Sequence, residues 1–139
     1  MRRMDTPRTL SLRTAGLALA LAGMTGLAAA ATPADLLAGY QAQAGAAPSA
    51  TRGQAFFTQR HGGEWACGSC HGNQPVGTGR HASTGKPIEP LAPAANAQRF
   101  TDAAKVEKWF RRNCKDVLSR ECSAAEKADV LAWLMEVKP

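Results

Sequence analysis

Two cysteines and a histidine near the middle of the chain have the types and spacing of a covalent haem attachment site. Residues 67–71 read Cys-Gly-Ser-Cys-His, the C-x-x-C-H signature of c-type haem. Thiols three positions apart can each add across one vinyl group of a haem to form two thioethers. The histidine that follows can bind the iron through a ring nitrogen. The motif therefore predicts one haem c, held covalently by Cys67 and Cys70, with His71 as an iron ligand.

The same spacing has two other interpretations. A thioredoxin-like C-x-x-C would make the protein a disulfide oxidoreductase without haem, but that motif belongs in a βαβ unit, and the sequence carries no such pattern. A zinc site would need a second pair of ligands at similar spacing, whereas His61 and His81 stand alone on either side of the motif.

The first 31 residues have the features of a secretory signal peptide. Four arginines precede an uncharged stretch rich in Ala and Leu over residues 15–31, which ends in a run of alanines with an A-x-A cleavage site. Export predicts a periplasmic protein and supports the haem interpretation; an uncleaved membrane anchor is the alternative. The chain thus divides into a signal peptide, residues 1–31, and one monohaem cytochrome c domain, residues 32–139, with a core at about 50–137.

The formal net charge of +6 owes much to this signal peptide. Residues 1–31 hold four of the 17 Lys and Arg residues and one of the 11 Asp and Glu residues, which leaves residues 32–139 at +3. A mildly positive surface suits docking to an acidic redox partner. No stripe of basic and aromatic residues indicates nucleic-acid binding.

The two remaining cysteines, Cys114 and Cys122, form an even pair in an oxidising compartment. We therefore expect a disulfide that closes a short, mixed-charge loop. Two free buried thiols are the alternative.

Helical signals dominate the exported part of the chain, and no alternating run indicates strands. The expected helices cover residues 33–40, 50–59, 102–113 and 124–137, capped by Thr32, Ser49, Thr101 and Ser123. Gly53 and Phe57 share a helical face, where the glycine would let the terminal helix cross closely. Glycines and prolines leave residues 72–100 without a long helix or strand, and we expect this loop to line one face of the haem. The prediction is a small all-α domain wrapped round one haem.

Few residues can occupy the second axial position of the iron. Met135 is the only methionine after the haem motif, but it lies in the terminal helix, where a core role fits better. His81 and His61 are close to the motif in the sequence, and we expect both to be loop residues. A plain electron carrier with a closed iron would use Met135 or His81.

Asn113 is a further candidate. Val106, Phe110 and Asn113 fall on one helical face, so the amide lies at the end of an apolar stripe and needs a polar partner. The iron could be that partner, through the amide oxygen. The alternative, which spacing alone favours, is an ordinary asparagine in a left-handed turn at the helix end.

Several segments after the haem motif occur together in one known group of proteins. They are residues 84–93, 96, 99–102, 105–110 and 112–114. With the C-x-x-C-H motif ahead of them, the sequence resembles the SHP group (sphaeroides haem protein), which are oxygen-binding, high-spin class I cytochromes c. The resemblance covers most of residues 50–137, and residues 33–40 look like an N-terminal extension to it.

The resemblance implies a small class I cytochrome c-like fold with one covalent haem at Cys67 and Cys70, His71 as the proximal ligand, and Asn113 as a labile distal ligand beside a Cys114–Cys122 disulfide. It implies an electron-accepting protein that binds O₂, NO or CO when it is reduced. A dihaem cytochrome c or a membrane cytochrome b is the implied electron donor. An open iron also permits an enzyme that reduces O₂, peroxide or NO, although no distal acid–base residue stands out.

Overall fold

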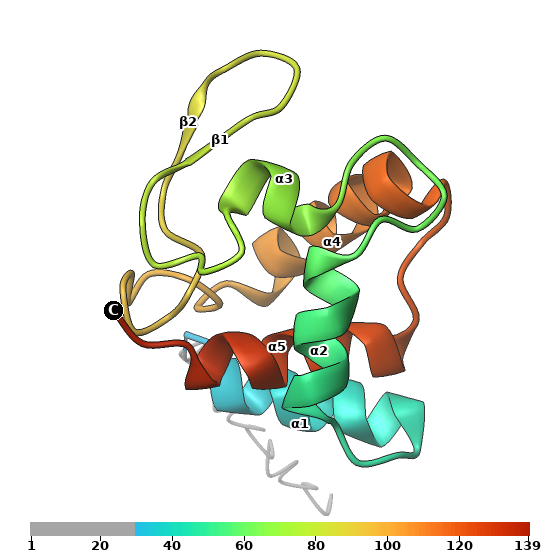
Figure 1. Ribbon diagram of the computed structural model, residues 1–139. Helices are drawn as coiled ribbons and strands as arrows, with labels where there is room; N and C mark the ends of the chain where they lie inside the picture. The colour runs from blue at the N-terminus through green and yellow to red at the C-terminus, as the bar shows by residue number, and fades with distance from the viewer. Residues whose placement is uncertain (1–29) are drawn as a thin grey trace, which may run out of the picture.

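The structure is a computed structural model that describes residues 30–139. In this part of the chain five helices surround a single core and one pair of short strands projects from it, so the expected all-α class is confirmed (Figure 1). The elements are α1 (Pro33–Ala44), α2 (Ala50–Thr58), α3 (Cys67–His71), β1 (Gly79–Arg80), β2 (Pro87–Ile88), α4 (Ala103–Leu118) and α5 (Ala124–Glu136). The predicted signal peptide, residues 1–31, lies outside the described residues except for its last two positions. Between residues 30 and 139, no helix combines the length and the apolar character that a membrane span requires.

Helix α1 begins at the cap that the sequence predicts and ends later than expected. The Thr32 hydroxyl accepts a hydrogen bond from the backbone N–H of Asp35 at 3.1 Å, and the Asp35 carboxylate accepts one from the Thr32 N–H, also at 3.1 Å. The helix continues past Tyr40 to Ala44. Gly45, with φ of 64°, is the first residue that leaves the helical conformation, as glycine does at many helix ends.

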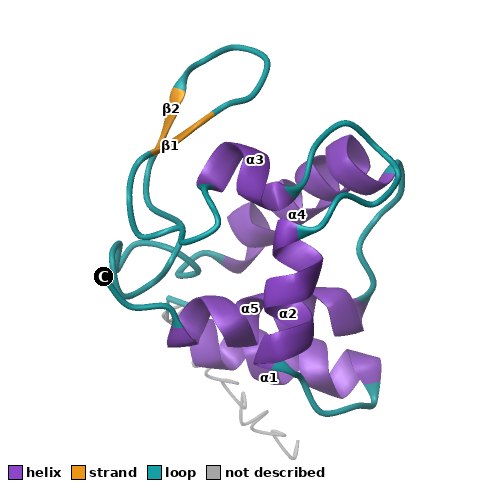
Figure 2. Cartoon of the chain, viewed as in Figure 1, coloured by secondary structure: helices purple, strands orange, loops and turns teal. Residues whose placement is uncertain are grey.

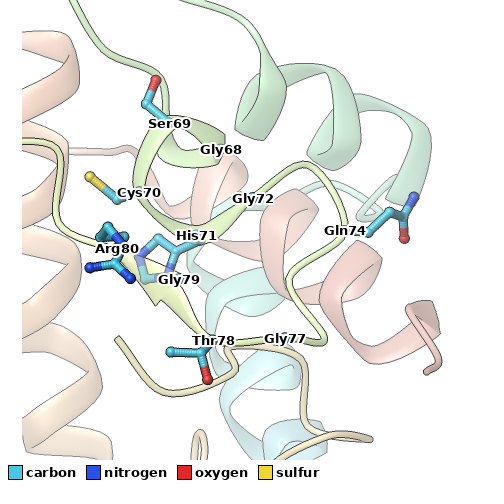
Figure 3. Close-up of a pocket in the computed structure, with 10 residues that line it drawn as sticks. All are labelled: Gly68, Ser69, Cys70, His71, Gly72, Gln74, Gly77, Thr78, Gly79 and Arg80. Atoms are coloured by element: carbon cyan, nitrogen blue, oxygen red, sulfur yellow. The ribbon is translucent and has the colours of Figure 1, made fainter. Parts of the chain in front are cut away.

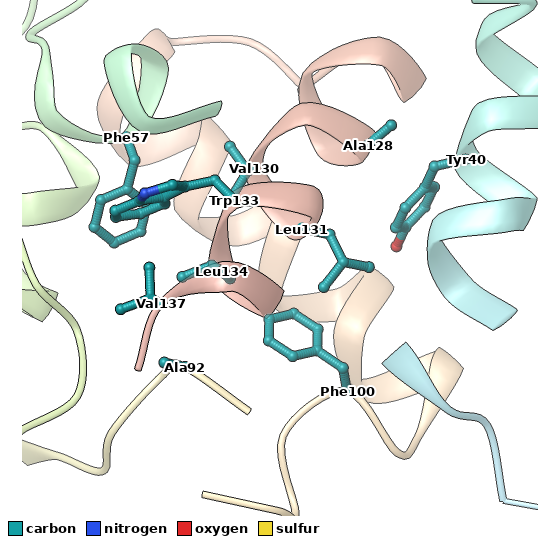
Figure 4. Close-up of a cluster of buried hydrophobic side chains, with 10 residues drawn as sticks. All are labelled: Tyr40, Phe57, Ala92, Phe100, Ala128, Val130, Leu131, Trp133, Leu134 and Val137. Atoms are coloured by element: carbon teal, nitrogen blue, oxygen red, sulfur yellow. The ribbon is translucent and has the colours of Figure 1, made fainter. Parts of the chain in front are cut away.

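Helices α2 and α5 cross closely at Gly53, as predicted. A β-carbon on Gly53 would overlap the backbone of Asp129 and Val130 in α5. One turn later Phe57 is 1% exposed, and its ring centroid lies 4.9 Å from that of Trp133. Figure 4 shows the buried cluster gathered round α5, with Phe57 and Trp133 at one end and Tyr40 at the other.

An ion pair fastens the start of α2 to α5. The carboxylate of Asp129, which is 7% exposed, accepts hydrogen bonds from the Ser49 backbone N–H at 2.6 Å and from Nε and Nη2 of Arg52 at 2.7 and 2.8 Å. The buried charge is therefore fully paired, which a charge removed from water requires.

Helix α4 begins later and runs farther than the predicted range of residues 102–113. Asp102, and not Thr101, is the residue that caps it. The helix continues to Leu118 because no glycine or proline interrupts it, and it ends where Ser119 adopts a left-handed conformation with φ of 58°. The expectation of a loop from residue 114 onward is therefore wrong for residues 114–118.

The predicted Cys114–Cys122 disulfide is present, with the two α-carbons 5.6 Å apart. It joins the last turns of α4 to the segment that leads into α5. Helix α5 begins at the predicted capping box, in which Ser123 and Glu126 each accept a hydrogen bond from the other's backbone N–H. The disulfide thus fixes α4 relative to the start of α5.

The segment between α3 and α4 is mostly irregular, as expected, but it contains a small hairpin (Figure 2). Strands β1 and β2 pair antiparallel over only two residues each, too short for any alternation in the sequence to reveal. The loop is held to the core at Pro75, whose carbonyl accepts hydrogen bonds from the N–H groups of Leu91 and Ala92, each at 3.0 Å. Ala92 is fully buried.

Candidate haem site

Helix α3 gathers the two thiols and the imidazole of the motif. A short helix places residues i, i+3 and i+4 on one side, so Cys67, Cys70 and His71 share a face of α3. Its first turn is stabilised by a hydrogen bond from the Ala66 N–H to the Ser69 hydroxyl at 3.0 Å. The motif residues are therefore held by local structure in the arrangement that attachment of one haem needs.

Glycines allow the chain to pass very close to α3. A β-carbon on Gly79, the first residue of β1, would overlap the carbonyl oxygen of Cys70, and one on Gly68 would lie 2.5 Å from the side-chain oxygen of Asn73. No pattern in the sequence indicates the close contact at Gly79. The close approach of β1 fixes the C-terminal end of α3.

The motif cysteines are not bonded to each other, and both are half-buried. Burial raises the pKa of Cys67 to about 11, and the sulfur of Cys70 accepts a hydrogen bond from the Ala82 N–H at 3.3 Å. A protonated thiol is unlike the low-pKa thiolate of redox-active C-x-x-C sites. The only strands in residues 30–139 are the two of the hairpin, so the βαβ unit of a thioredoxin-like site is absent from the described structure.

His71 carries the imidazole available to an iron. Burial, and secondly the positive charge of Arg99, lower the pKa of His71 to about 4. The ring is therefore neutral at physiological pH and keeps a lone pair for a metal. It lies beside the core, with its centroid 6.1 Å from that of Phe57.

A hollow of about 290 Å³ lies against Cys70 and His71 (Figure 3). It is formed entirely by α3 and the chain that leads into β1, and is lined by Gly68, Ser69, Cys70, His71, Gly72, Gln74, Gly77, Thr78, Gly79 and Arg80. Four of these ten residues are glycines, so backbone and not side chain forms much of the wall. The hollow contacts Cys70 and His71 but not Cys67, so it marks open space at one end of the motif.

Asn113 lies inside α4 and is half-buried, on the same side as Val106 and Phe110, which pack against the core. Among the described residues, the only non-glycine positions with positive φ are Phe100 and Ser119. The interpretation of Asn113 as a left-handed helix end is therefore wrong. Its side chain is free of any capping role.

Comparison with known proteins places the chain in a family. A family model described as "Domain of unknown function (DUF1924)" matches residues 43–134. The cytochrome c-type protein SHP of Cereibacter sphaeroides is 50% identical over 119 residues, which cover 83% of this chain and 87% of the relative. The chain belongs to the SHP group of c-type cytochromes. It is therefore a haem c protein, as the motif predicts.

Solved structures of SHP and of cytochrome c'' have the same fold. A structure of oxidised SHP, described as an oxygen-binding cytochrome c, superposes with a TM-score of 0.72 at 49% identity and covers 76% of this chain and 96% of that one. Cytochrome c'' of Methylophilus methylotrophus is 48% identical over 98 residues, or 67% of this chain and 68% of the relative. Its oxidised crystal structure superposes with a TM-score of 0.69 at 40% identity, covering 77% of this chain and 95% of that one. The predicted cytochrome c-like fold is confirmed.

Helix α1 is shared with the SHP group. A match over 83% of the 139-residue chain spans about 115 residues, more than the 107 residues from 33 to 139, so it must include α1. The expectation that residues 33–40 are an extension beyond the group's core is therefore wrong.

The other candidate ligands of an SHP-type iron have partners of their own. Met135 is half-buried and packs against the core cluster. His81 lies in the hairpin, where its Nδ1 accepts a hydrogen bond from the Thr84 N–H at 3.4 Å. The Nε2 of His61 lies 2.8 Å from the Phe56 carbonyl. Within residues 30–139 no three His, Cys, Asp or Glu side chains gather as a zinc site requires.

Arg99 has a structural role that the sequence does not reveal. The Arg99 guanidinium donates hydrogen bonds to the carbonyls of Pro90 at 2.8 Å and Glu89 at 2.7 Å. Its positive charge also helps to lower the pKa of His71. Arg99 therefore fastens the proline-rich loop next to the imidazole. No local pattern reveals this role, because the partners lie nine and ten positions away in the sequence.

Proposed function

We propose that the protein is a periplasmic monohaem cytochrome c that accepts electrons and, when reduced, releases Asn113 from the iron to bind a diatomic ligand such as O₂, NO or CO. The observation that carries the proposal is the position of Asn113. It lies in the middle of a stable helix, half-buried, at the end of an apolar face, with no capping role. The amide is not committed to a helix cap, so its oxygen is available to an iron on that face of α4.

On the proximal side, Cys67 and Cys70 hold the haem by two thioethers and His71 binds the iron. Two thiols on one face of α3 suit addition to two vinyl groups, and a neutral imidazole at His71 needs no proton loss before it binds. The Arg99 side chain keeps the proline-rich loop against this side. The bound haem supplies an iron that alternates between ferric and ferrous forms and accepts small ligands.

On the distal side, Asn113 offers an amide oxygen, which is a hard and weak donor. Such a donor prefers ferric to ferrous iron, so reduction weakens its hold and frees a position for an incoming ligand. The disulfide at the next residue, Cys114, restrains the helix so that the amide leaves and returns over a short path. An oxygen donor in place of a thioether also favours the ferric state and lowers the reduction potential.

Two relatives support a labile distal ligand. The SHP structure is that of an oxygen-binding cytochrome c. A solution structure of cytochrome c'' from M. methylotrophus, with 42% identity and a TM-score of 0.66, is described in terms of haem-ligand detachment. We propose a dihaem cytochrome c or a membrane cytochrome b as the electron donor. Cleavage of residues 1–31 would deliver the protein to the periplasm, and a mature N-terminus near Thr32 in the mass spectrum tests that step.

The deciding experiment is the optical spectrum of the reduced protein with and without CO. We expect a high-spin ferrous spectrum that changes on addition of CO. A sharp low-spin ferrous spectrum that CO leaves unchanged would mean a closed iron and contradict the proposal.

Three variants identify the ligand. Asn113→Ala is expected to change the ferric spectrum. Met135→Leu and His81→Ala are the matched controls, since a closed electron carrier would use one of those side chains. A changed spectrum in either control, with none in Asn113→Ala, would assign the protein to that alternative function.

A further inference from the structure

Three charged or polar side chains join α1, α4 and α5 at one point. The Tyr40 hydroxyl of α1 donates a hydrogen bond to Oε1 of Glu107 in α4 at 2.6 Å. The Nζ of Lys127 in α5 donates one to Oε2 of the same carboxylate at 2.7 Å. We call Tyr40, Glu107 and Lys127 the helix clamp.

Aromatic contacts extend the helix clamp along α4. The Tyr40 ring meets the Phe110 ring edge-on, with centroids 5.8 Å apart, and the Lys127 ammonium lies 5.4 and 5.9 Å from the centroids of Tyr40 and Phe110. Tyr40 is 3% exposed and the Lys127 side chain 16%. The Glu107 side chain is 42% exposed, so the aromatic side of the cluster is shielded from water while the carboxylate is partly open to it.

The protonation states keep the clamp closed. Burial, and then the Glu107 carboxylate, raise the pKa of Tyr40, so the phenol remains a donor. Although burial alone would raise it, the hydrogen bonds from Lys127 and Tyr40 lower the pKa of Glu107. The carboxylate therefore stays charged and accepts both bonds.

Helix α4 depends on such side chains for its position. In the described structure α1 and α2 pack their backbones closely against α5, whereas α4 makes no comparably close helix-to-helix packing. The Cys114–Cys122 bond fixes one point of α4, but a single point leaves the helix able to rotate about its axis. The clamp supplies a second point at Glu107, seven residues before Cys114, which is about 10.5 Å along the axis.

Asn113 lies between these two points. Phe110 is one turn after Glu107 and one turn before Asn113, and Cys114 follows Asn113 directly. Any rotation of α4 that opened the Glu107 hydrogen bonds would also swing the Asn113 amide. We propose that Tyr40, Glu107 and Lys127 are positioning residues for the distal ligand, which hold α4 in the rotation at which Asn113 reaches the iron. This inference rests on the proposed role of Asn113.

The test measures how well imidazole, added to the oxidised haem protein, competes with Asn113. Tyr40→Phe keeps the ring and removes only the hydrogen bond. We expect it to raise imidazole affinity about three- to tenfold, which corresponds to the net contribution of one ordinary hydrogen bond. It should also raise the reduction potential. Glu107→Gln, which retains an acceptor for Tyr40 but no charge for Lys127, provides a second and milder variant.

Arg52→Gln is the matched control. It opens the Asp129 ion pair, which joins α2 to α5 and leaves α4 untouched. It is expected to lower the melting temperature without changing imidazole affinity. Unchanged affinity in both clamp variants, or an equal rise in Arg52→Gln, would overturn the inference.

The Asn113→Ala background separates this inference from the proposed function. There Tyr40→Phe should have no further effect on imidazole affinity, since no amide remains to be positioned; an effect of unchanged size would overturn the inference. If Asn113→Ala itself binds imidazole with wild-type affinity, the proposed distal ligand is wrong. If Asn113→Ala binds more tightly but Tyr40→Phe does not, only the clamp inference fails.

Discussion

Gly53 of α2 lies so close to the carbonyl of Asp129 in α5 that even a single methyl group would overlap it. The crossing brings Phe57, one turn later, into the core, where its ring centroid lies 4.9 Å from that of Trp133 and 6.1 Å from that of His71. The position of the haem motif relative to the core therefore depends on a glycine well before it in the sequence.

Gly53→Ala is expected to destabilise the fold by at least about 1–3 kcal/mol, the usual range for overpacking a tight contact. Thermal unfolding of the haem protein measures the change. Gly39→Ala is the control, because Gly39 lies in α1 with nothing within 4 Å of an added β-carbon. That substitution should stabilise the protein slightly, as alanine is the better helix former. A neutral Gly53→Ala would mean that the two helices can separate without loss.

The capping box of α5 is expected to make stability depend on pH. The hydrogen bond from Arg120, with those of Ser123, lowers the pKa of Glu126. A lowered carboxylate pKa stabilises the fold above the ordinary glutamate value, about 4.3, and this contribution is lost as the pH falls through the folded-state value.

Glu126→Gln should therefore be less stable at neutral pH by about 1 kcal/mol, with the difference shrinking toward zero under acidic conditions. Denaturant unfolding at several pH values measures it. Glu121→Gln, which alters only an exposed pair with Lys115 at 4.0 Å, should give no such trend. A pH-independent difference for Glu126→Gln would contradict the assignment.

The disulfide is expected to act on stability and on the iron together. Replacing Cys114 and Cys122 by serine should lower the free energy of unfolding by roughly 2–3 kcal/mol, the loop-closure contribution of a short disulfide loop. It should also increase imidazole binding to the oxidised protein, since α4 loses the fixed point next to Asn113. Lower stability with unchanged imidazole binding would make the disulfide purely structural.

Local patterns in the sequence predicted much of this fold, whereas contacts between residues far apart in the sequence could not be predicted from it. The Ser123 capping box and the Thr32 cap each depend on residues only three positions apart, so both were predicted. The end of α4 was not, because a mixed-charge run between two cysteines resembles a loop, and only the structure shows that Val117 is buried in a continuing helix.

The candidate site divides in the same way. Cys67, Cys70 and His71 form a contiguous motif, so the sequence was enough to propose them. Tyr40 and Glu107 are 67 residues apart, and neither lies in a motif, so only tertiary structure brings them together. Spacing alone favoured a left-handed helix end at Asn113. That interpretation was wrong because α4 ends at Ser119 and not at Asn113.

The two thiols should be separable in their effect on haem retention. Cys67→Ala should leave a haem bound by one thioether, and the double change with Cys70→Ala should leave none. Extraction with acidified acetone, followed by the haem mass remaining on the protein, measures both. Haem that resists extraction in the double variant would place covalent attachment elsewhere in the chain.

The identity of the atom opposite His71 should set the potential. On the proposed role of Asn113, Asn113→Met would replace a hard oxygen by a thioether, which prefers ferrous iron, so the iron should stay closed on reduction. The potential should rise by something on the order of 100 mV, within the roughly 0.8 V range that axial ligands span. CO binding to the reduced protein should slow sharply.

Asn96→Met, in the proline-rich loop, is the control and should leave both the potential and CO binding unchanged, since the Asn96 side chain contacts only loop backbone at Pro90 and Gln98. If Asn113→Met instead bound CO as fast as the wild type, with the wild-type potential, residue 113 would lie out of reach of the iron.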